Sequence, residues 1–198
     1  NMIKQKNMKR IYLLCICILT ISFAKAQELT VSSPDSNLKV NLKVEAGNLL
    51  YSVTYKDKTM LEASPLGLLT NIGDFSKTLS LTGSEKGTVK DSYTLDRIKQ
   101  SRIHYAANKL TVKLVNADMH PLNVIFHVSN NDIAFRYEIP KKGETGSMVI
   151  LKEATGFDFP EYTTTFLTPQ SDPMIGWKRT KPSYEENYKP DAPLTERS

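Results

Sequence analysis

The sequence predicts an all-β fold, an antiparallel β-sandwich of many short strands. Two patterns indicate this fold class. Apolar and polar residues alternate with a period of two along several stretches, and ten prolines and nine glycines interrupt these stretches at short intervals. A third observation excludes the main alternative, because no window of about twelve residues carries an apolar stripe at helical spacing.

The clearest alternation runs over Leu38–Glu45, where leucine and valine occupy every second position. Residues 33–37, which precede it, have the composition of a turn, and residues 46–48, which follow it, have that of a hairpin loop. We therefore expect the next strand over residues 49–55, a turn at residues 56–58, and further pairing over residues 59–62.

The second half of the chain repeats this pattern. Alternation over residues 110–115 is broken at residues 116–121, resumes over residues 122–128, and returns over residues 133–139 after Asn130, Asn131 and Asp132. These three polar residues could suggest a cation site, but a tight hairpin turn explains them better. The alternation also places Phe135 on the inward face of its strand and His127 on the outward face of its own.

Charge and cysteine content exclude several classes of function. The 26 basic residues exceed the 21 acidic ones by five, and five basic residues with no acid lie within residues 1–26. Residues 27–198 are therefore formally neutral, which removes the main support for nucleic-acid binding. Both cysteines, Cys15 and Cys17, also lie in the first segment, so the body has no disulfide scaffold, thiol nucleophile or cysteine-ligated zinc.

The first 26 residues have the organisation of an export signal. Lys9 and Arg10 follow Met8, an apolar run covers residues 11–23, and small residues lie at Ala24 and Ala26. We expect cleavage between Ala26 and Gln27, a periplasmic or secreted product, and no membrane span in the mature chain. A buried N-terminal helix is the alternative interpretation of this segment.

Residues 168–198 differ from the rest of the chain. They contain five prolines and little alternation, which predicts an extended segment lying over another part of the protein. The sequence then ends without a terminating element, so we expect it to be a piece of a larger protein.

Within that segment, Trp177, Glu185 and Glu186 are the residues that could bind a sugar or a metal. An aromatic ring beside carboxylates suits a sugar, yet two adjacent glutamates on a strand point to opposite faces and make a poor acid/base pair. Calcium takes six to eight oxygen ligands, so a glutamate here could be only one ligand of a site completed elsewhere. A charged, solvent-exposed connector is the alternative interpretation. From the residues alone, no catalytic machinery is evident.

Several stretches resemble the N-terminal domain of glycoside hydrolase family 97, and the resemblance runs over residues 27–198. The most specific are NDIAFRYEIP at residues 131–140 and SYEENY at residues 183–188. Weaker support comes from SPD at residues 33–35, SPLGL at residues 64–68, and Tyr105 followed by ANKL at residues 107–110.

This resemblance implies a β-supersandwich that precedes a catalytic (β/α)8 barrel and a small C-terminal β domain. These two further domains are absent from this sequence, since a barrel alone needs ~250 residues. The family hydrolyses terminal α-linked glucose or galactose in oligosaccharides at a site that holds calcium. By the resemblance, the catalytic carboxylates belong to the barrel, so this fragment alone should be inactive.

The same resemblance implies the roles of individual residues. Glu185 matches a glutamate with which the N-terminal domain ligates the calcium, and Glu186 is the alternative if the match shifts by one residue. Residues 175–182 look more like the α-galactosidase branch than the α-glucosidase branch.

Two other functions remain in competition. The chain could be a standalone exported β-sandwich that binds carbohydrate through Trp177 without cleaving it, or a structural module of the cell envelope.

Overall fold

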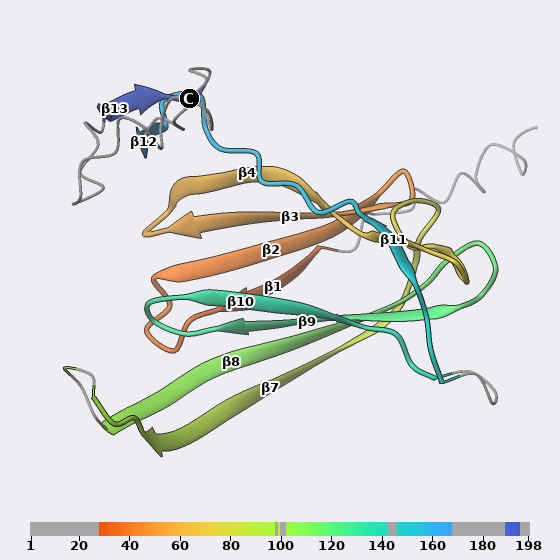
Figure 1. Ribbon diagram of the computed structural model, residues 1–198, viewed down its shortest axis with the longest axis horizontal. Helices are drawn as coiled ribbons and strands as arrows, with labels where there is room; N and C mark the ends of the chain where they lie inside the picture. The colour runs from red at the N-terminus through yellow and green to blue at the C-terminus, as the bar shows by residue number, and fades with distance from the viewer. Residues whose placement is uncertain (1–27, 98, 100–101, 142–145, 168–188, 195–198) are drawn as a thin grey trace, which may run out of the picture.

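The computed structural model describes residues 28–97, 99, 102–141, 146–167 and 189–194. Over this part of the chain the predicted all-β sandwich is confirmed: the described residues contain strands and no helix. Two four-stranded antiparallel sheets form two layers, with β2–β4 in one and β8–β10 in the other (Figure 1). It follows that no described element is a helix long and apolar enough to cross a membrane.

The first sheet has the order β1-β2-β3-β4. Its strands are β1 (Leu29–Ser32), β2 (Leu38–Glu45), β3 (Asn48–Tyr55) and β4 (Lys58–Leu66). The predicted hairpins are confirmed, and each connection is a two-residue turn with positive φ at both positions, Ala46 and Gly47 in one and Lys56 and Asp57 in the other. Turns of this kind match the right-handed twist of the paired strands.

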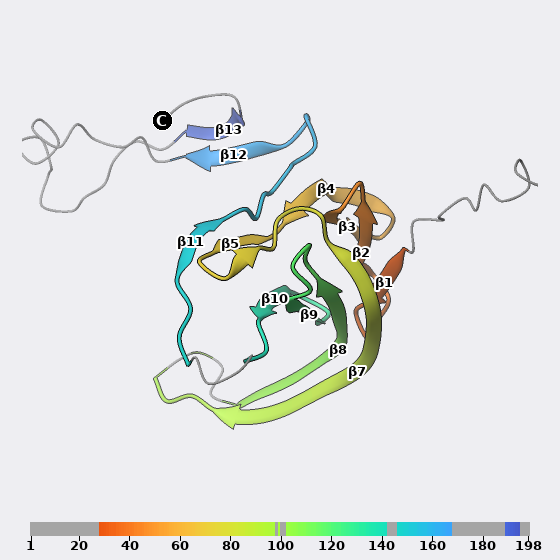
Figure 2. The same ribbon diagram turned by 90° about the vertical axis from the view of Figure 1, so that its right-hand side faces the viewer.

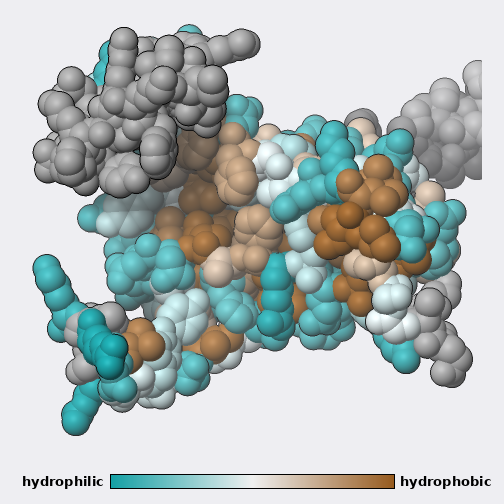
Figure 3. All heavy atoms as spheres, viewed as in Figure 1, coloured by the Kyte–Doolittle hydropathy of each residue, from teal (hydrophilic) through white to brown (hydrophobic). Residues whose placement is uncertain are grey.

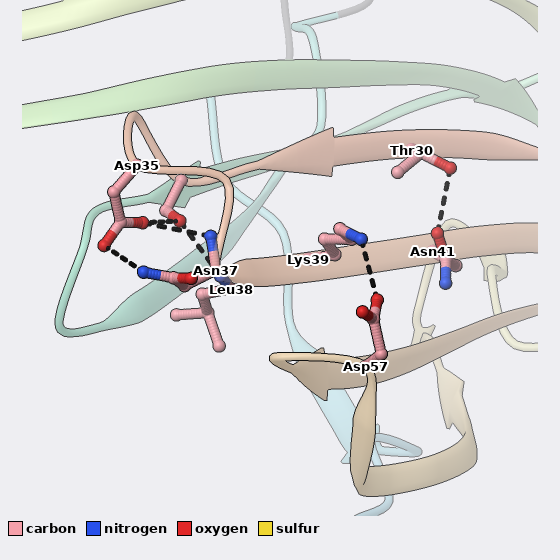
Figure 4. A network of polar contacts seen from close by, with 8 residues as sticks. Thr30, Asp35, Asn37, Leu38, Lys39, Asn41 and Asp57 are labelled. Atoms are coloured by element: carbon pink, nitrogen blue, oxygen red, sulfur yellow. Dashed lines mark hydrogen bonds and ion pairs between the residues drawn. The ribbon is translucent and has the colours of Figure 1, made fainter.

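The predicted turn between β1 and β2 is held by its own polar side chains (Figure 4). The hydroxyl of Ser33 donates to Asp35 (2.5 Å), and the backbone and side-chain amides of Asn37 donate to the same carboxylate at 3.1 and 2.8 Å. The hydrogen bond from Ser33, followed by those from Asn37, lowers the pKa of Asp35. This acidic residue therefore stabilises a turn.

The second sheet has the order β10-β9-β8-β7. Its strands are β7 (Ser80–Thr94), β8 (Arg102–Val115), β9 (Pro121–Val128) and β10 (Ile133–Glu138). The predicted strands over residues 110–115, 122–128 and 133–139 all lie here. The structure extends β8 toward Arg102, where it pairs with β7 alone, so the outer half of this hairpin is a two-stranded ribbon.

Two smaller sheets complete the described fold. One has the order β11-β5-β6, with β5 (Leu68–Thr70), β6 (Gly73–Asp74) and β11 (Ile150–Glu153). The other pairs β12 (Thr164–Leu167) with β13 (Lys189–Pro193). β11 lies at one open side of the sandwich, and the β12–β13 pair lies outside the two main layers (Figure 2).

The core lies between the two main sheets, as the alternation predicts. Fully buried side chains from the first sheet include Val40, Leu42 and Leu49, and they face a matching set from the second: Leu110, Val112, Leu114, Leu122, Val124, Phe126 and Val128. Each such side chain contributes about 1.5–3 kcal/mol through burial. Phe135 packs against this core from β10, so its predicted inward orientation is confirmed.

Candidate functional site

The feature that bears most on function is an extended segment that closes one side of the sandwich. We call residues 154–160, which follow β11, the strap. Its backbone amides at Ala154 and Gly156 donate to the carbonyls of Gly67 (2.9 Å) and Pro65 (2.9 Å). The amide of Asp158 donates to Ser64 Oγ (2.9 Å), and its carbonyl accepts from the amide of Glu62 (2.7 Å). The strap therefore covers the free edge of β4, an edge that would otherwise expose unpaired backbone groups.

Two tyrosines fasten the strap from inside the sandwich. Tyr51 Oη donates to the carbonyl of Gly156 (3.2 Å). Tyr137 Oη lies 2.6 Å from Thr155 Oγ1 and accepts a hydrogen bond from the amide of Gly67 (2.9 Å). Burial, with a smaller contribution from Tyr137, raises the pKa of Tyr51 to about 12. Burial likewise raises the pKa of Tyr137. Both hydroxyls are therefore protonated at neutral pH and act as hydrogen-bonding anchors.

An aromatic cluster lies beneath these anchors. The ring of Tyr51 lies 6.0 Å from Phe126, 5.9 Å from Phe135 and 6.4 Å from Phe157, a residue of the strap. The ring of Tyr137 meets Phe135 edge-on at 5.9 Å. Offset and edge-on ring pairs at these spacings are favourable. The strap is thus fixed by hydrogen bonds at its backbone and by ring contacts on one of its side chains.

Beyond the strap, the chain turns and enters β12. Thr163 donates its backbone amide to the carbonyl of Pro160 (2.9 Å), which closes the turn. Tyr162 Oη donates to the carbonyl of Thr59 (2.8 Å), and Lys58 Nζ lies 5.0 Å from the centre of the Tyr162 ring. These contacts tie the start of the β12–β13 pair to the start of β4.

The β12–β13 pair flanks the segment that contains the predicted site residues. Leu167 pairs with Lys189 in the antiparallel ladder, so residues 168–188 connect two neighbouring positions of one small sheet. Trp177, Glu185 and Glu186 belong to this stretch and lie outside the described residues. The structure therefore shows the stem that carries them. Sequence reasoning expected an extended segment here but did not predict this stem or the strap.

The described histidines show no catalytic or metal-binding arrangement. His120 Nδ1 lies 2.7 Å from the carbonyl of Ile72, and His127 lies on the outer face, as predicted, where burial and then Lys109 and Arg136 lower its pKa. His104 Nδ1 lies 3.0 Å from Ser92 Oγ, a cross-strand partner that sequence reasoning missed. Both residues are exposed on the outer ribbon. Among the described residues, no group of three or more His, Cys, Asp or Glu side chains could hold a metal.

The predicted turn at Asn130, Asn131 and Asp132 is confirmed. Ser129 Oγ donates to Asp132 Oδ2 (2.7 Å) and accepts from the amides of Asn131 (3.2 Å) and Asp132 (3.1 Å). Asn130 Oδ1 accepts from the backbone amide of Asp35 (3.0 Å) and so joins this turn to the β1–β2 turn. The hydrogen bonds of these residues therefore stabilise this turn and join it to the β1–β2 turn.

A hollow of about 350 Å³ opens where β9 begins and β10 ends. Its walls are largely apolar, with Ile72, Pro121, Ile139 and Met148 beside His120 and Lys141. No carboxylate of the described residues lines it, so these residues supply none of the paired acids that glycoside hydrolysis requires.

The described residues thus form an antiparallel β-sandwich with a small outer sheet, β12–β13, that is joined to residues 168–188. The family described as Glycosyl-hydrolase 97 N-terminal matches residues 31–198, and the chain belongs to this family. The family resemblance predicted from the sequence is therefore confirmed.

Relatives and solved structures agree with this assignment. A probable retaining alpha-galactosidase of Streptomyces bingchenggensis is 28% identical over 160 residues, which cover 78% of this chain and 25% of that protein. The retaining alpha-galactosidase of Bacteroides thetaiotaomicron is 26% identical over 132 residues, 66% of this chain and 19% of that protein. The chain thus spans about a quarter or less of the length of these relatives.

Among solved structures, a beta-arabinopyranosidase is 54% identical, with a TM-score of 0.77 over 87% of this chain and 28% of that chain. A Glycoside Hydrolase Family 97 enzyme from Pseudoalteromonas sp. strain K8, solved in complex with acarbose, is 25% identical. Its TM-score is 0.65 over 72% of this chain and 22% of that chain. The relatives are glycoside hydrolases, so the family is enzymatic.

Proposed function

We propose that this chain is the N-terminal domain of an exported, calcium-dependent exo-glycosidase. The whole enzyme would release a terminal β-L-arabinopyranosyl or α-D-galactosyl residue from an oligosaccharide. The observation that carries this proposal is the 54% identity to a beta-arabinopyranosidase over most of the chain, alongside the family match over residues 31–198.

The two proposed sugars share the same ring configuration and differ only in one exocyclic group. L-Arabinopyranose is D-galactopyranose that lacks the exocyclic CH₂OH group, and a β-linkage in the L-arabino series has the same geometry as an α-linkage in the D-galacto series. The names of the arabinopyranosidase and of the galactosidase relatives therefore describe substrates with the same ring stereochemistry. This supports a refinement of the expected galactoside preference toward the smaller sugar.

An α-glucoside is the alternative substrate. The Pseudoalteromonas enzyme was solved with acarbose, whose units have the gluco configuration, and it is 25% identical to this chain. Glucose differs from galactose in the orientation of the hydroxyl at C4. A site that hydrogen-bonds one orientation leaves buried polar groups unpaired with the other. The higher identity to the arabinopyranosidase favours the galacto configuration.

Within this proposal, this domain supplies one ligand of the calcium site, and the catalytic acids belong to a barrel that follows the domain. A carboxylate oxygen is a ligand that Ca²⁺ prefers, so Glu185, or Glu186 in its place, has suitable donor chemistry for one part of a calcium site. A single carboxylate provides at most two of the six to eight oxygens, and the described residues contain no metal-binding group of their own. The remaining ligands would come from the barrel, where bound calcium would polarise the substrate.

Export is part of the same proposal. It is supported by the n-region, apolar run and small-residue site within residues 1–26, and by the start of β1 at Leu29, two residues beyond the expected cut between Ala26 and Gln27. N-terminal sequencing of the native protein from its own cells should give Gln27 as the first residue. A native product of about 20 kDa would favour the standalone carbohydrate-binding alternative, because the chain has a mass of 22.3 kDa before residues 1–26 are removed.

The decisive experiment uses the complete encoded polypeptide with three p-nitrophenyl glycosides. The proposal expects the highest kcat/KM for the β-L-arabinopyranoside, measurable activity on the α-D-galactopyranoside, and a value at least ~100-fold lower for the α-D-glucopyranoside. Chelation should abolish turnover, and added Ca²⁺ should restore it. A kcat/KM that is highest for the α-glucoside would refute the proposed specificity, and full activity in excess chelator would refute the calcium dependence.

A further inference from the structure

The strap and the segments beside it expose an unusual concentration of large hydrophobic side chains. Seven of the fifteen exposed large hydrophobic residues in the described structure lie between residues 149 and 166. They are Val149, Ile150 and Leu151 around β11, Phe157 and Phe159 on the strap, Tyr162, and Phe166 in β12. Figure 3 shows hydrophobic surface gathered on the face that the strap crosses in Figure 1.

The aromatic members of this set are too exposed to belong to the core of this domain. Phe157, Tyr162 and Phe166 are 61–63% exposed, and Phe159 is 45% exposed. Four such rings expose on the order of 400–500 Å² of mostly apolar surface, which reaches the size of the largest patches on typical monomers. Apolar patches of this size are often functional.

The backbone under this surface is rigidly held, which suits a preformed docking face. The strap carries four backbone hydrogen bonds to the β4–β5 region, and Tyr51 and Tyr137 fasten it from within. Tyr162 is pinned through its hydroxyl to Thr59. Binding would therefore order few groups that are not already ordered, which lowers the cost of association.

We propose that this surface, residues 149–166, is covered by the catalytic domain of the same polypeptide. This inference rests on the proposed function and goes beyond it, because it states which face of the sandwich meets the barrel. The relatives are about four times as long as the matched region, and a protein of that length would hold its further domains beside this one at high effective concentration. The surface also adjoins the β12–β13 stem, from which residues 168–188 would reach the barrel.

Two other occupants are less suited to this surface. A sugar would stack on an exposed ring while polar groups bind its hydroxyls, but the aliphatic side chains of Val149, Ile150 and Leu151 offer those hydroxyls no polar partner. A second copy of the chain would meet the patch only at the concentration of free protein, in competition with the tethered domain. Contacts between domains of one chain typically bury roughly 600–1,500 Å² in total, a range that an apolar patch of this size could form part of.

The test is hydroxyl-radical footprinting of the complete polypeptide, with each rate divided by the intrinsic reactivity of its residue type. Two tyrosines make a matched pair, because Tyr162 is 62% exposed in the sandwich and Tyr93, on the outer ribbon, is 46% exposed. If the surface of residues 149–166 were free, Tyr162 would react faster than Tyr93. The proposal expects the reverse, with Tyr162, Phe157 and Phe159 at least tenfold slower than Tyr93 and than Met119, which is 69% exposed.

The outcomes separate the three occupants. Equal or faster reaction of Tyr162 would overturn the proposal. Protection that disappears on dilution, together with a dimer by light scattering, would assign the face to a second copy. Protection that arises only when arabinose- or galactose-containing oligosaccharide is added would assign it to sugar. Because footprinting does not depend on turnover, a polypeptide inactive on all three glycosides but protected at the strap would refute the proposed activity and leave the docking surface standing.

A substitution provides a second measurement. Phe159→Ser in the complete polypeptide should split one calorimetric transition into two, because the sandwich and barrel would no longer unfold together. Met119→Ser is the matched control, since it also removes an exposed hydrophobic side chain, and it should leave one transition. Identical thermograms for the two variants would count against the docking role of Phe159.

Discussion

The hydroxyl of Tyr137 should be an energetic anchor of the strap. Tyr137→Phe removes one oxygen, and with it the acceptor for the amide of Gly67 (2.9 Å) and the partner of Thr155 Oγ1 (2.6 Å). Gly67 is buried, so its amide would be left without a partner. Leaving a buried donor unsatisfied costs about 1–3 kcal/mol. We expect a loss of about 2 kcal/mol in the local stability of the strap.

Hydrogen exchange of the complete polypeptide measures this loss. The amides of Ala154 and Gly156 are hydrogen-bonded to the β4–β5 region and exchange only when the strap opens. A loss of about 2 kcal/mol corresponds to exchange roughly 30-fold faster in the peptide that carries them. Peptides from the core of β8 and β9 should be unchanged. Tyr55→Phe, at an exposed tyrosine in the same sandwich, is the control. Acceleration below about threefold would refute the anchoring role.

Three further predictions follow from named contacts. Phe126→Ala should lower the free energy of unfolding by ~3–5 kcal/mol because Phe126 is fully buried. Phe135→Ala should lower it by less because part of the Phe135 side chain remains accessible. Urea denaturation that ranks the two variants in the reverse order would refute this prediction. Because the folded state raises the pKa of Tyr51 from 10.0 to about 12, its contribution to stability is complete below pH 10 and is lost as the pH rises toward 12. The unfolding midpoint should therefore fall less steeply over this range in Tyr51→Phe, and equal slopes would contradict the assignment. In the complete enzyme, Glu185→Gln should weaken calcium binding at least about 10-fold by calorimetry, because even a residue that only orients a metal ligand is worth that much, while Glu186→Gln should leave it unchanged. The opposite result would select Glu186.

The sequence predicts an element well where one face of the element is buried and the other is wet. Leu38–Glu45 and Pro121–Val128 show this contrast, with Val40, Leu42, Leu122 and Val124 fully or almost fully buried, and their alternation is visible in the residue order. β7 is the opposite case, because most of Ser80–Thr94 is exposed and its position depends on pairing with β8. No alternation can reveal a strand whose two faces meet nearly the same solvent.

The strap could not be predicted for a different reason. Its conformation is decided by partners far away in sequence, such as Tyr51 and Ser64, and its residues carry no periodic pattern of their own. The aromatic residues of the strap are visible in the sequence. The sequence does not tell, however, whether an aromatic ring is buried in the core of its own domain or exposed on the surface of that domain. The candidate ligands Glu185 and Glu186 rest on the family resemblance.

The strap also bears on the order in which the protein folds. Tyr51 meets Gly156 across a sequence separation of 105 residues, and Ser64 meets Asp158 across 94, whereas the hairpins of the main sheets join neighbouring strands. Contacts between distant residues form late, because the chain must first lose the entropy of closing a long loop. The sandwich should therefore assemble before the strap closes over it. The β12–β13 stem, which continues from the strap, would then be set in place only on a domain that has already folded.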